Sequence, residues 1–215
     1  MKKIAVLSLC LLSAAAFFGG CKKPVDYTDY ISEMRYGIWL YSSDGVEVKI
    51  YRSAKENPYI ADGIKSEMGD ITEVFVTLPK NYEEVNITVG GAGGEMSYRA
   101  VENCYYISFA DAVAGDSADV SLSCGDDSYT CTAVSVLYDG VMDCDSAVKC
   151  VIEHDGELFT SMTENGIFRG EIYVRLLYDE GCYYYVGVCD RDKNISAYLV
   201  DGERGKIIAT KKLNG

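Results

Sequence analysis

Between residues 34 and 138, apolar and polar positions alternate with a period of two, in short segments separated by turn residues. The first two segments, residues 35–41 and 46–52, are joined by a Ser-Ser-Asp-Gly turn. Because successive side chains of a strand point to opposite faces, this alternation predicts half-buried β-strands. Six more strands are expected at residues 73–78, 85–90, 96–101, 105–110, 120–124 and 129–138. Eight short strands with regular turn signals predict an antiparallel β-sandwich over residues 34–138.

The pattern changes at residues 139–145, which we take as a domain boundary. Residues 146–162 carry apolar side chains at helical spacing, with Asp145 or Ser146 as the N-cap and Gly156 as an interruption that allows two shorter helices. Asn165-Gly166 is expected to end this helical stretch. Further strands are expected at residues 170–177, 182–190, 195–201 and 206–211. A helix packed on a small antiparallel sheet is therefore predicted for residues 139–215, which makes the chain mainly β with an α+β module.

Two family resemblances accompany these predictions. The number and spacing of strands in residues 34–138 resemble an immunoglobulin-like (Ig-like) sandwich, although no cysteine precedes Trp39 there. The segments Tyr-Tyr-Tyr-Val-Gly-Val, Ala-Tyr-Leu-Val-Asp and Gly-Lys-Ile-Ile, within residues 183–208, resemble the end of a PepSY domain, with Arg204 where that family has Thr or Ser. The second resemblance covers residues 145–212. It implies binding, because PepSY domains are thought to inhibit or chaperone peptidases, and it brings no catalytic residue.

The first 21 residues resemble a bacterial lipoprotein signal. Two lysines precede an apolar run over residues 4–18, and Gly19-Gly20 stands directly before Cys21, with Phe18 in a slot that usually holds Leu, Val or Ala. The resemblance implies removal of residues 1–20 and acylation of Cys21, on the extracytoplasmic face of a bacterial cell envelope. An ordinary secretory signal or an uncleaved anchor are the alternatives. Residues 21–33 are then expected to form a tether.

The charge is strongly negative and bears on the partners. The chain has 20 basic and 33 acidic residues, a net charge of −13, and removal of residues 1–20 leaves 18 basic residues and a net charge of −15. A field of this sign argues against nucleic acid and against a polybasic membrane patch. Membrane attachment is therefore expected only through acyl chains on Cys21.

Cysteine usage leaves two interpretations open. Nine cysteines are present, and seven remain when Cys10 leaves with the signal and Cys21 is acylated. In an exported chain these seven allow up to three disulfides and one free thiol, or they serve as small buried apolar residues. Cys124 and Cys131 flank a turn-like stretch and are the only pair that the spacing favours for a disulfide.

Candidate catalytic and metal-binding residues are few. His154 is the only histidine, is expected to be exposed, and has no partner pattern for nucleophilic catalysis. Asp190, Asp192, Asn194 and Asp201, with Ser196, imitate the oxygen spacing of a calcium loop, but Ile195 occupies the glycine position, so a hairpin turn is the simpler interpretation. We therefore expect no enzyme activity, no resident metal and no cofactor.

Tyrosine is the remaining candidate for recognition. The chain has 18 tyrosines, and Tyr183, Tyr184 and Tyr185 are consecutive, so at least one must lie on each face of the sheet. Exposed tyrosines suit recognition, whereas the plainer interpretation is that tyrosine favours half-buried strand positions. The sequence predicts a non-enzymatic, lipid-anchored protein whose C-terminal module binds a protein partner such as an extracytoplasmic peptidase. Glycan or small-ligand binding through exposed tyrosines, or a purely structural spacer, are the alternatives.

Overall fold

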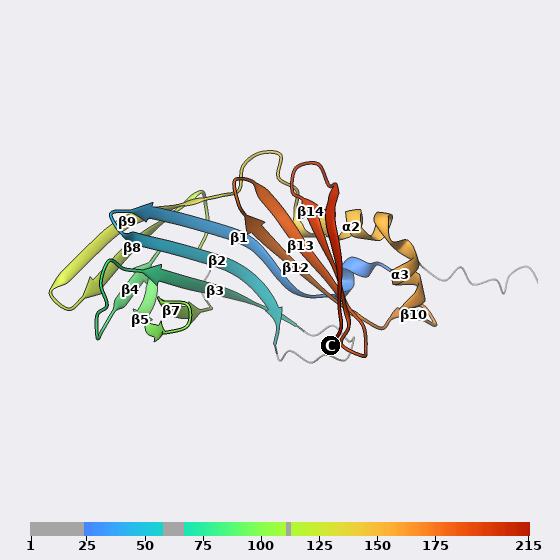
Figure 1. The fold of residues 1–215 in the computed structure, drawn as a ribbon, viewed down its shortest axis with the longest axis horizontal. Coiled ribbons are helices and arrows are strands. Elements are labelled where there is room, and N and C mark those ends of the chain that lie inside the picture. Colours follow the sequence, from blue (N-terminus) through green and yellow to red (C-terminus); the bar gives the residue numbers. More distant parts are fainter. Residues whose placement is uncertain (1–23, 58–66, 111–112) are drawn as a thin grey trace, which may run out of the picture.

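In a computed structural model, which describes residues 24–57, 67–110 and 113–215, the chain is mainly β with two α-helices (Figure 1). Thirteen of the described strands join in one sheet, in the order β15-β14-β13-β12-β1-β2-β3-β7-β6, with β9, β8, β4 and β5 continuing from β1. In the N-terminal half the strands are β1 (Ile31–Ser43), β2 (Val46–Glu56), β3 (Met68–Thr77), β4 (Asn86–Val89), β5 (Ala92–Glu95), β6 (Ser97–Arg99), β7 (Cys104–Phe109), β8 (Ser117–Cys124) and β9 (Asp127–Ser135).

The N-terminal strands form a strongly curled sheet. From β6 through β1 to β5 they are hydrogen-bonded in a continuous path that is nearly barrel-like. The inward positions of β1, β2, β3, β4 and β8 build one apolar core, which includes Trp39, Val48, Val74 and Leu122. The alternation seen in the sequence thus corresponds to one face turned to this core and one turned outward.

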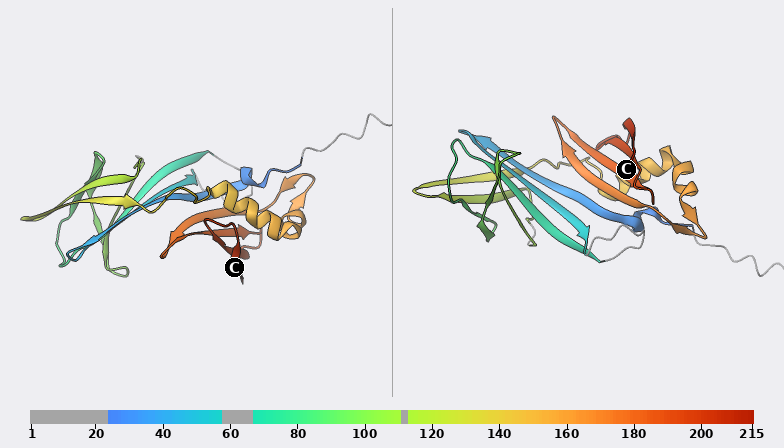
Figure 2. Two further views of the ribbon diagram at one scale, coloured as in Figure 1. Left: turned by 90° about the horizontal axis from the view of Figure 1, so that it is seen from above. Right: turned by 60° about the horizontal axis from the view of Figure 1, so that its bottom comes forward.

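The C-terminal half consists of two helices on one face of four strands. These strands are β12 (Glu171–Tyr178), β13 (Cys182–Cys189), β14 (Ile195–Asp201) and β15 (Ile207–Leu213), and Figure 2 shows α2 (Cys144–His154) and α3 (Gly156–Ser161) on one side of them. Asp143 is the N-cap of α2, since its Oδ1 accepts a hydrogen bond of 2.7 Å from the Ser146 amide. The expected helix therefore begins before residue 146 and breaks at Asp155.

Asn165 and Gly166, expected to end that helix, instead form a hairpin turn. Both have positive φ angles, 55° and 80°, and they connect β10 (Thr163–Glu164) with β11 (Ile167–Phe168). Asn-Gly is the favoured dipeptide for a two-residue hairpin turn, because both positions need the left-handed region. The dipeptide therefore marks a hairpin turn between two strands, and not the end of a helix.

Strand β1 belongs to both halves. Its N-terminal residues, from Ile31 to Arg35, pair in parallel with β12, whereas Trp39 and Leu40 pair antiparallel with β9 on the same edge. Along the other edge β2 accompanies β1 over nearly its full length, with a register shift between Arg35 and Gly37. The sheet therefore forks at β1, and the two apolar cores lie on either side of this fork (Figure 1).

Residues 27–33 are part of the fold and not of a tether. The 3₁₀ helix η1 (Tyr27–Tyr30) places the ring of Tyr27 5.0 Å from that of Phe159 and 5.4 Å from that of Phe168, and Ile31 is only 2% exposed. The chain thus enters the C-terminal core before it reaches the N-terminal core. The expected signal peptide, residues 1–20, and the acylated Cys21 lie outside the described residues. Within the described residues, no helix is both long and apolar enough to cross a membrane.

Candidate functional site

The three consecutive tyrosines of β13 are divided between the two faces of the sheet. Tyr184 points toward α2, is 2% exposed, and donates a hydrogen bond of 2.5 Å from its hydroxyl to the carbonyl oxygen of Met142. Burial raises the pKa of the Tyr184 hydroxyl above its usual value. Tyr183 and Tyr185 lie on the opposite, helix-free face and are partly exposed. Tyr184 is therefore a core residue, and only its neighbours remain available for recognition.

Tyr185 spreads along the sheet surface because its neighbour on the same face is a glycine. A β-carbon added to Gly187 would lie 3.0 Å from the Tyr185 hydroxyl oxygen and 3.1 Å from its Cε1. The ring therefore covers the space that a side chain at position 187 would need. The ring thus lies against the sheet beside Gly187 and is partly exposed.

The outer side of this ring borders a hollow of about 500 Å³, which we call the Tyr185 hollow. Its volume falls in the range of small-ligand sites, about 300–1,000 Å³. Strands β1, β2, β12, β13 and β14 all contribute, so the hollow bridges the fork at β1. Its lining residues are Glu33, Lys55, Glu56, Tyr173, Arg175, Tyr185 and Ile195.

The charged groups of the Tyr185 hollow are held in fixed positions by partners. Arg175 Nε lies 2.7 Å from Glu33 Oε1, across the parallel pair β1–β12, and this hydrogen bond raises the pKa of Arg175. Lys55 Nζ lies 3.9 Å from Glu73 Oε2. Because these pairs are partly exposed, they contribute little stability but orient donors and acceptors. The hollow thus combines one open ring with polar groups of both signs.

Next to the hollow, a row of stacked side chains crosses the same face. The guanidinium of Arg35 lies 4.2 Å from the centre of the Tyr51 ring, and that of Arg99 lies 3.4 Å from the centre of the Tyr106 ring. Phe75 stands between the two tyrosines, with ring centres 5.6 Å and 5.0 Å away. The arginines cover the Tyr51 and Tyr106 rings by cation–π contact, so the row stiffens the sheet.

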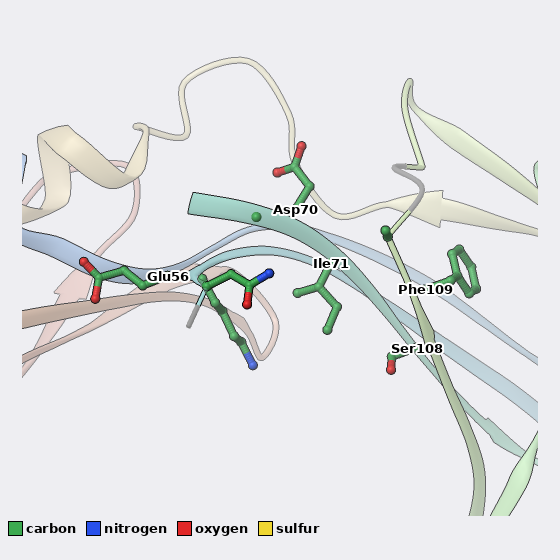
Figure 3. Close-up of a pocket in the computed structure, with 9 residues that line it drawn as sticks. Glu56, Asp70, Ile71, Ser108 and Phe109 are labelled. Carbon is green, nitrogen blue, oxygen red and sulfur yellow. The ribbon is translucent and has the colours of Figure 1, made fainter. Parts of the chain in front are cut away.

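Another hollow, of about 380 Å³, lies at the ends of β2, β3 and β7 (Figure 3). Figure 3 shows Asp70 and Glu56 pointing away from Ile71 and from Ser108. Its polar groups therefore do not converge on one point, as a specific ligand site requires. We assign no function to it.

The weak calcium-loop candidates do not form one loop. Asp190 Oδ1 accepts hydrogen bonds of 2.9 Å from the amides of Asp192 and Asn194, and its Oδ2 accepts one from the Asn194 side chain. These hydrogen bonds, that from the Asn194 side chain first, lower the pKa of Asp190. Asp201 lies at the other end of β14 and caps a different turn. Over the described ranges, no group of three or more His, Cys, Asp or Glu side chains could hold a metal ion.

His154 and its neighbour Asp155 have structural positions. His154 is exposed in the last turn of α2, with its ring centre 6.3 Å from that of Tyr198. Asp155 accepts a hydrogen bond of 2.7 Å from the Tyr198 hydroxyl and caps α3 through the Leu158 amide. This pair therefore attaches the corner between the helices to β14.

Cys124 and Cys131 do not form the expected disulfide. In the β8–β9 ladder Cys124 pairs with Asp127, whereas Cys131 pairs with Val120. Four residues therefore separate the two cysteines along the strands, about 13 Å at the rise of an extended strand. A disulfide needs α-carbons within about 7 Å. All seven cysteines of the described chain are free.

We expect these thiols to react slowly in the folded chain. Burial raises the pKa of each, for Cys144 to about 12, so little reactive thiolate is present near pH 8. Thiol titration with an aromatic disulfide reagent should be slow in buffer and fast in guanidinium chloride. A native chain that reacts at once, or that changes its mobility on reduction, would contradict the free and buried state of these cysteines.

The comparisons with known proteins identify no relative. No family model, no curated protein and no solved structure matches the chain. The residues of the Tyr185 hollow are therefore the basis for a functional proposal. Four of them, Glu33, Lys55, Glu56 and Arg175, had no motif in the sequence, and only the pairing of β1 with β2 and β12 brings them together.

Proposed function

We propose that this chain is a non-enzymatic, lipid-anchored protein of the bacterial cell envelope that binds a glycan in the Tyr185 hollow. The observation that carries the proposal is the partly exposed Tyr185 ring, which lies against Gly187 and lines the hollow beside the paired Arg175 and Glu33. Cys21 would hold the chain at the membrane surface through its acyl chains. In this proposal the N-terminal half is an Ig-like module and the C-terminal half a PepSY-like module, with the ligand at the fork between them.

A saccharide suits these groups chemically. A sugar ring has a face of C–H groups, which packs on an aromatic ring, and a rim of hydroxyl groups, which both donate and accept hydrogen bonds. Arg175 supplies fixed donors and Glu33 supplies acceptors, in the same hollow as the ring of Tyr185. Since Arg175 and Glu33 already neutralise each other, a neutral ligand leaves no charge unpaired.

The pairing of Arg175 with Glu33 also favours binding over catalysis. The carboxylate of Glu33 is engaged by Arg175 at 2.7 Å, an arrangement that holds both groups in place. Glycoside hydrolysis would need a pair of carboxyl groups poised on either side of the bond. The paired groups of the hollow instead provide a rigid polar edge beside an aromatic surface.

Replacing Tyr185 with alanine is expected to weaken glycan binding by roughly tenfold. This factor corresponds to the loss of an aromatic contact that contributes about 1–1.5 kcal/mol. A glycan array would find the strongest saccharide, and calorimetric titration would give its affinity for each variant. Tyr178→Ala is the matched control, because Tyr178 is likewise a strand tyrosine that reaches the surface but does not line the hollow. An array without signal, or an equal loss for both variants, would contradict the proposal.

A second variant tests the position of the ring and belongs to the same experiment. Gly187→Ala would place a methyl group 3.0–3.3 Å from Tyr185, so the ring must move away from the sheet. Affinity should fall while the far-UV circular dichroism spectrum stays unchanged. Retained affinity would show that the Tyr185 ring, in its position against Gly187, is not the binding surface.

A protein partner of the C-terminal half, such as an extracytoplasmic peptidase, is the second candidate function. One observation favours it: β15 ends the sheet with its outer edge free of any strand in the part of the chain that the structure describes. A free edge offers main-chain hydrogen bonds to an extended segment of another protein.

A further inference from the structure

Strand β15 presents a straight and exposed edge. Its register with β14 runs without interruption from Ala209, opposite Leu199, to Leu213, opposite Ile195. Residues 208–212 are all exposed, and Figure 1 shows β15 as the outermost strand of the C-terminal sheet. Five consecutive paired residues are a usual strand length, so the edge is long enough to accept another strand.

The charge of this edge is opposite to that of the chain. Lys211 and Lys212 lie on β15 and Lys206 directly before it, whereas the whole chain has a net charge of −13. None of these three lysines has an ion pair with a described residue. Adjacent strand residues point to opposite faces, so Lys211 and Lys212 place a positive charge on each side of the edge.

Lysines on an edge strand discourage pairing with a like-charged or apolar edge. The same charges favour a strand that carries carboxylates, because opposite charges on neighbouring strands stabilise pairing. We propose that β15 accepts an extended acidic segment of a partner protein as an added strand, with its carboxylates beside Lys211 and Lys212. This inference rests on the second candidate function and supplies the chemistry of the partner.

The probe is a fluorescent peptide of about nine residues in which valines flank pairs of adjacent glutamates, so that an added strand carries carboxylates on both faces, and it is long enough to pair along the whole edge. Its binding to residues 22–215, which include every described residue, would be followed by fluorescence anisotropy. The double variant Lys211→Glu, Lys212→Glu should bind the peptide roughly tenfold more weakly, by loss and reversal of two charge pairs. Lys149→Glu, an exposed position on α2, is the matched control and should bind normally.

Alternate N-methylation of the peptide separates strand addition from simple charge attraction. Methyl groups on the amides that face β15 remove the ladder hydrogen bonds, whereas methyl groups on the other set leave them intact. One of the two methylated peptides, and only one, should therefore lose binding, and those amides of residues 209–212 that point away from β14 should gain protection from hydrogen exchange. Equal binding of both peptides, or no effect of the double variant, would overturn the inference.

Other outcomes are also decisive. A concentration-dependent dimer that the double variant abolishes, without peptide binding, would assign the edge to a second copy of the chain and overturn the acidic partner. Capture of a peptidase by the double variant as strongly as by the original chain would leave the second candidate function standing. That result would remove β15 as its docking surface.

Discussion

Replacing Tyr184 with alanine is expected to lower the free energy of unfolding by about 3–5 kcal/mol, the usual cost of removing a large ring from a core. Tyr184 is 2% exposed among the buried residues of α2, β12 and β14, and its hydroxyl binds the Met142 carbonyl oxygen. Urea unfolding followed by circular dichroism would measure the change. Tyr185→Ala, one residue away on the open face, should shift it by less than about 1 kcal/mol.

The variant Tyr184→Phe separates the contribution of the buried ring from that of the hydroxyl hydrogen bond. It keeps the ring and leaves the Met142 carbonyl oxygen without its donor, so a loss of about 1–2 kcal/mol is expected. Equal midpoints for Tyr184→Ala and Tyr185→Ala would contradict the assignment of opposite faces in β13.

A chain that begins at Met34 is expected to lose the fold of its C-terminal half, a loss of more than about 5 kcal/mol, which is comparable with the whole stability of a small domain. The truncation removes η1, the buried side chain of Ile31 and the partner of Arg175. It also removes the first residues of the parallel pair β1–β12. Hydrogen exchange should show lost protection in β12 and β13.

A chain that begins at Pro24 is the control for this truncation, and it should retain full protection. The single substitution Ile31→Ala should cost about 2–5 kcal/mol by itself. Unchanged protection of β12 in the chain that begins at Met34 would show that residues 27–33 act only as a tether.

Local patterns predicted most of the strands and helices. The alternation of β8 and of β12 reflects one face turned to a core, and this relation lies within a few residues. Asn165-Gly166 shows the limit of such patterns, because the dipeptide signals a chain reversal but does not tell a helix end from a hairpin turn. That choice depends on the packing of Phe168 against Phe159.

The fork at β1 had no local signal. Ile31 pairs with Ile172, about 140 positions along the chain, and no turn or period connects them. Residues 21–33 were therefore expected to be a tether, because the alternation of apolar and polar positions begins only at residue 34. Because successive residues of a strand alternate between faces, the sequence did predict that Tyr184 and Tyr185 lie on different faces. Which of these faces is open depends on the side that α2 covers. The Tyr185 hollow likewise needs five strands that only the complete sheet brings together.

The shared strand also determines how the molecule would carry a mechanical load. In a chain held at its N-terminus, tension enters at η1 and passes directly into β1, where both cores are attached. Both halves are thus attached to the same strand, so the load does not pass through one half before it reaches the other. Pulling would strain the short β1–β12 junction first, and the curled N-terminal sheet would then be released from the C-terminal sheet.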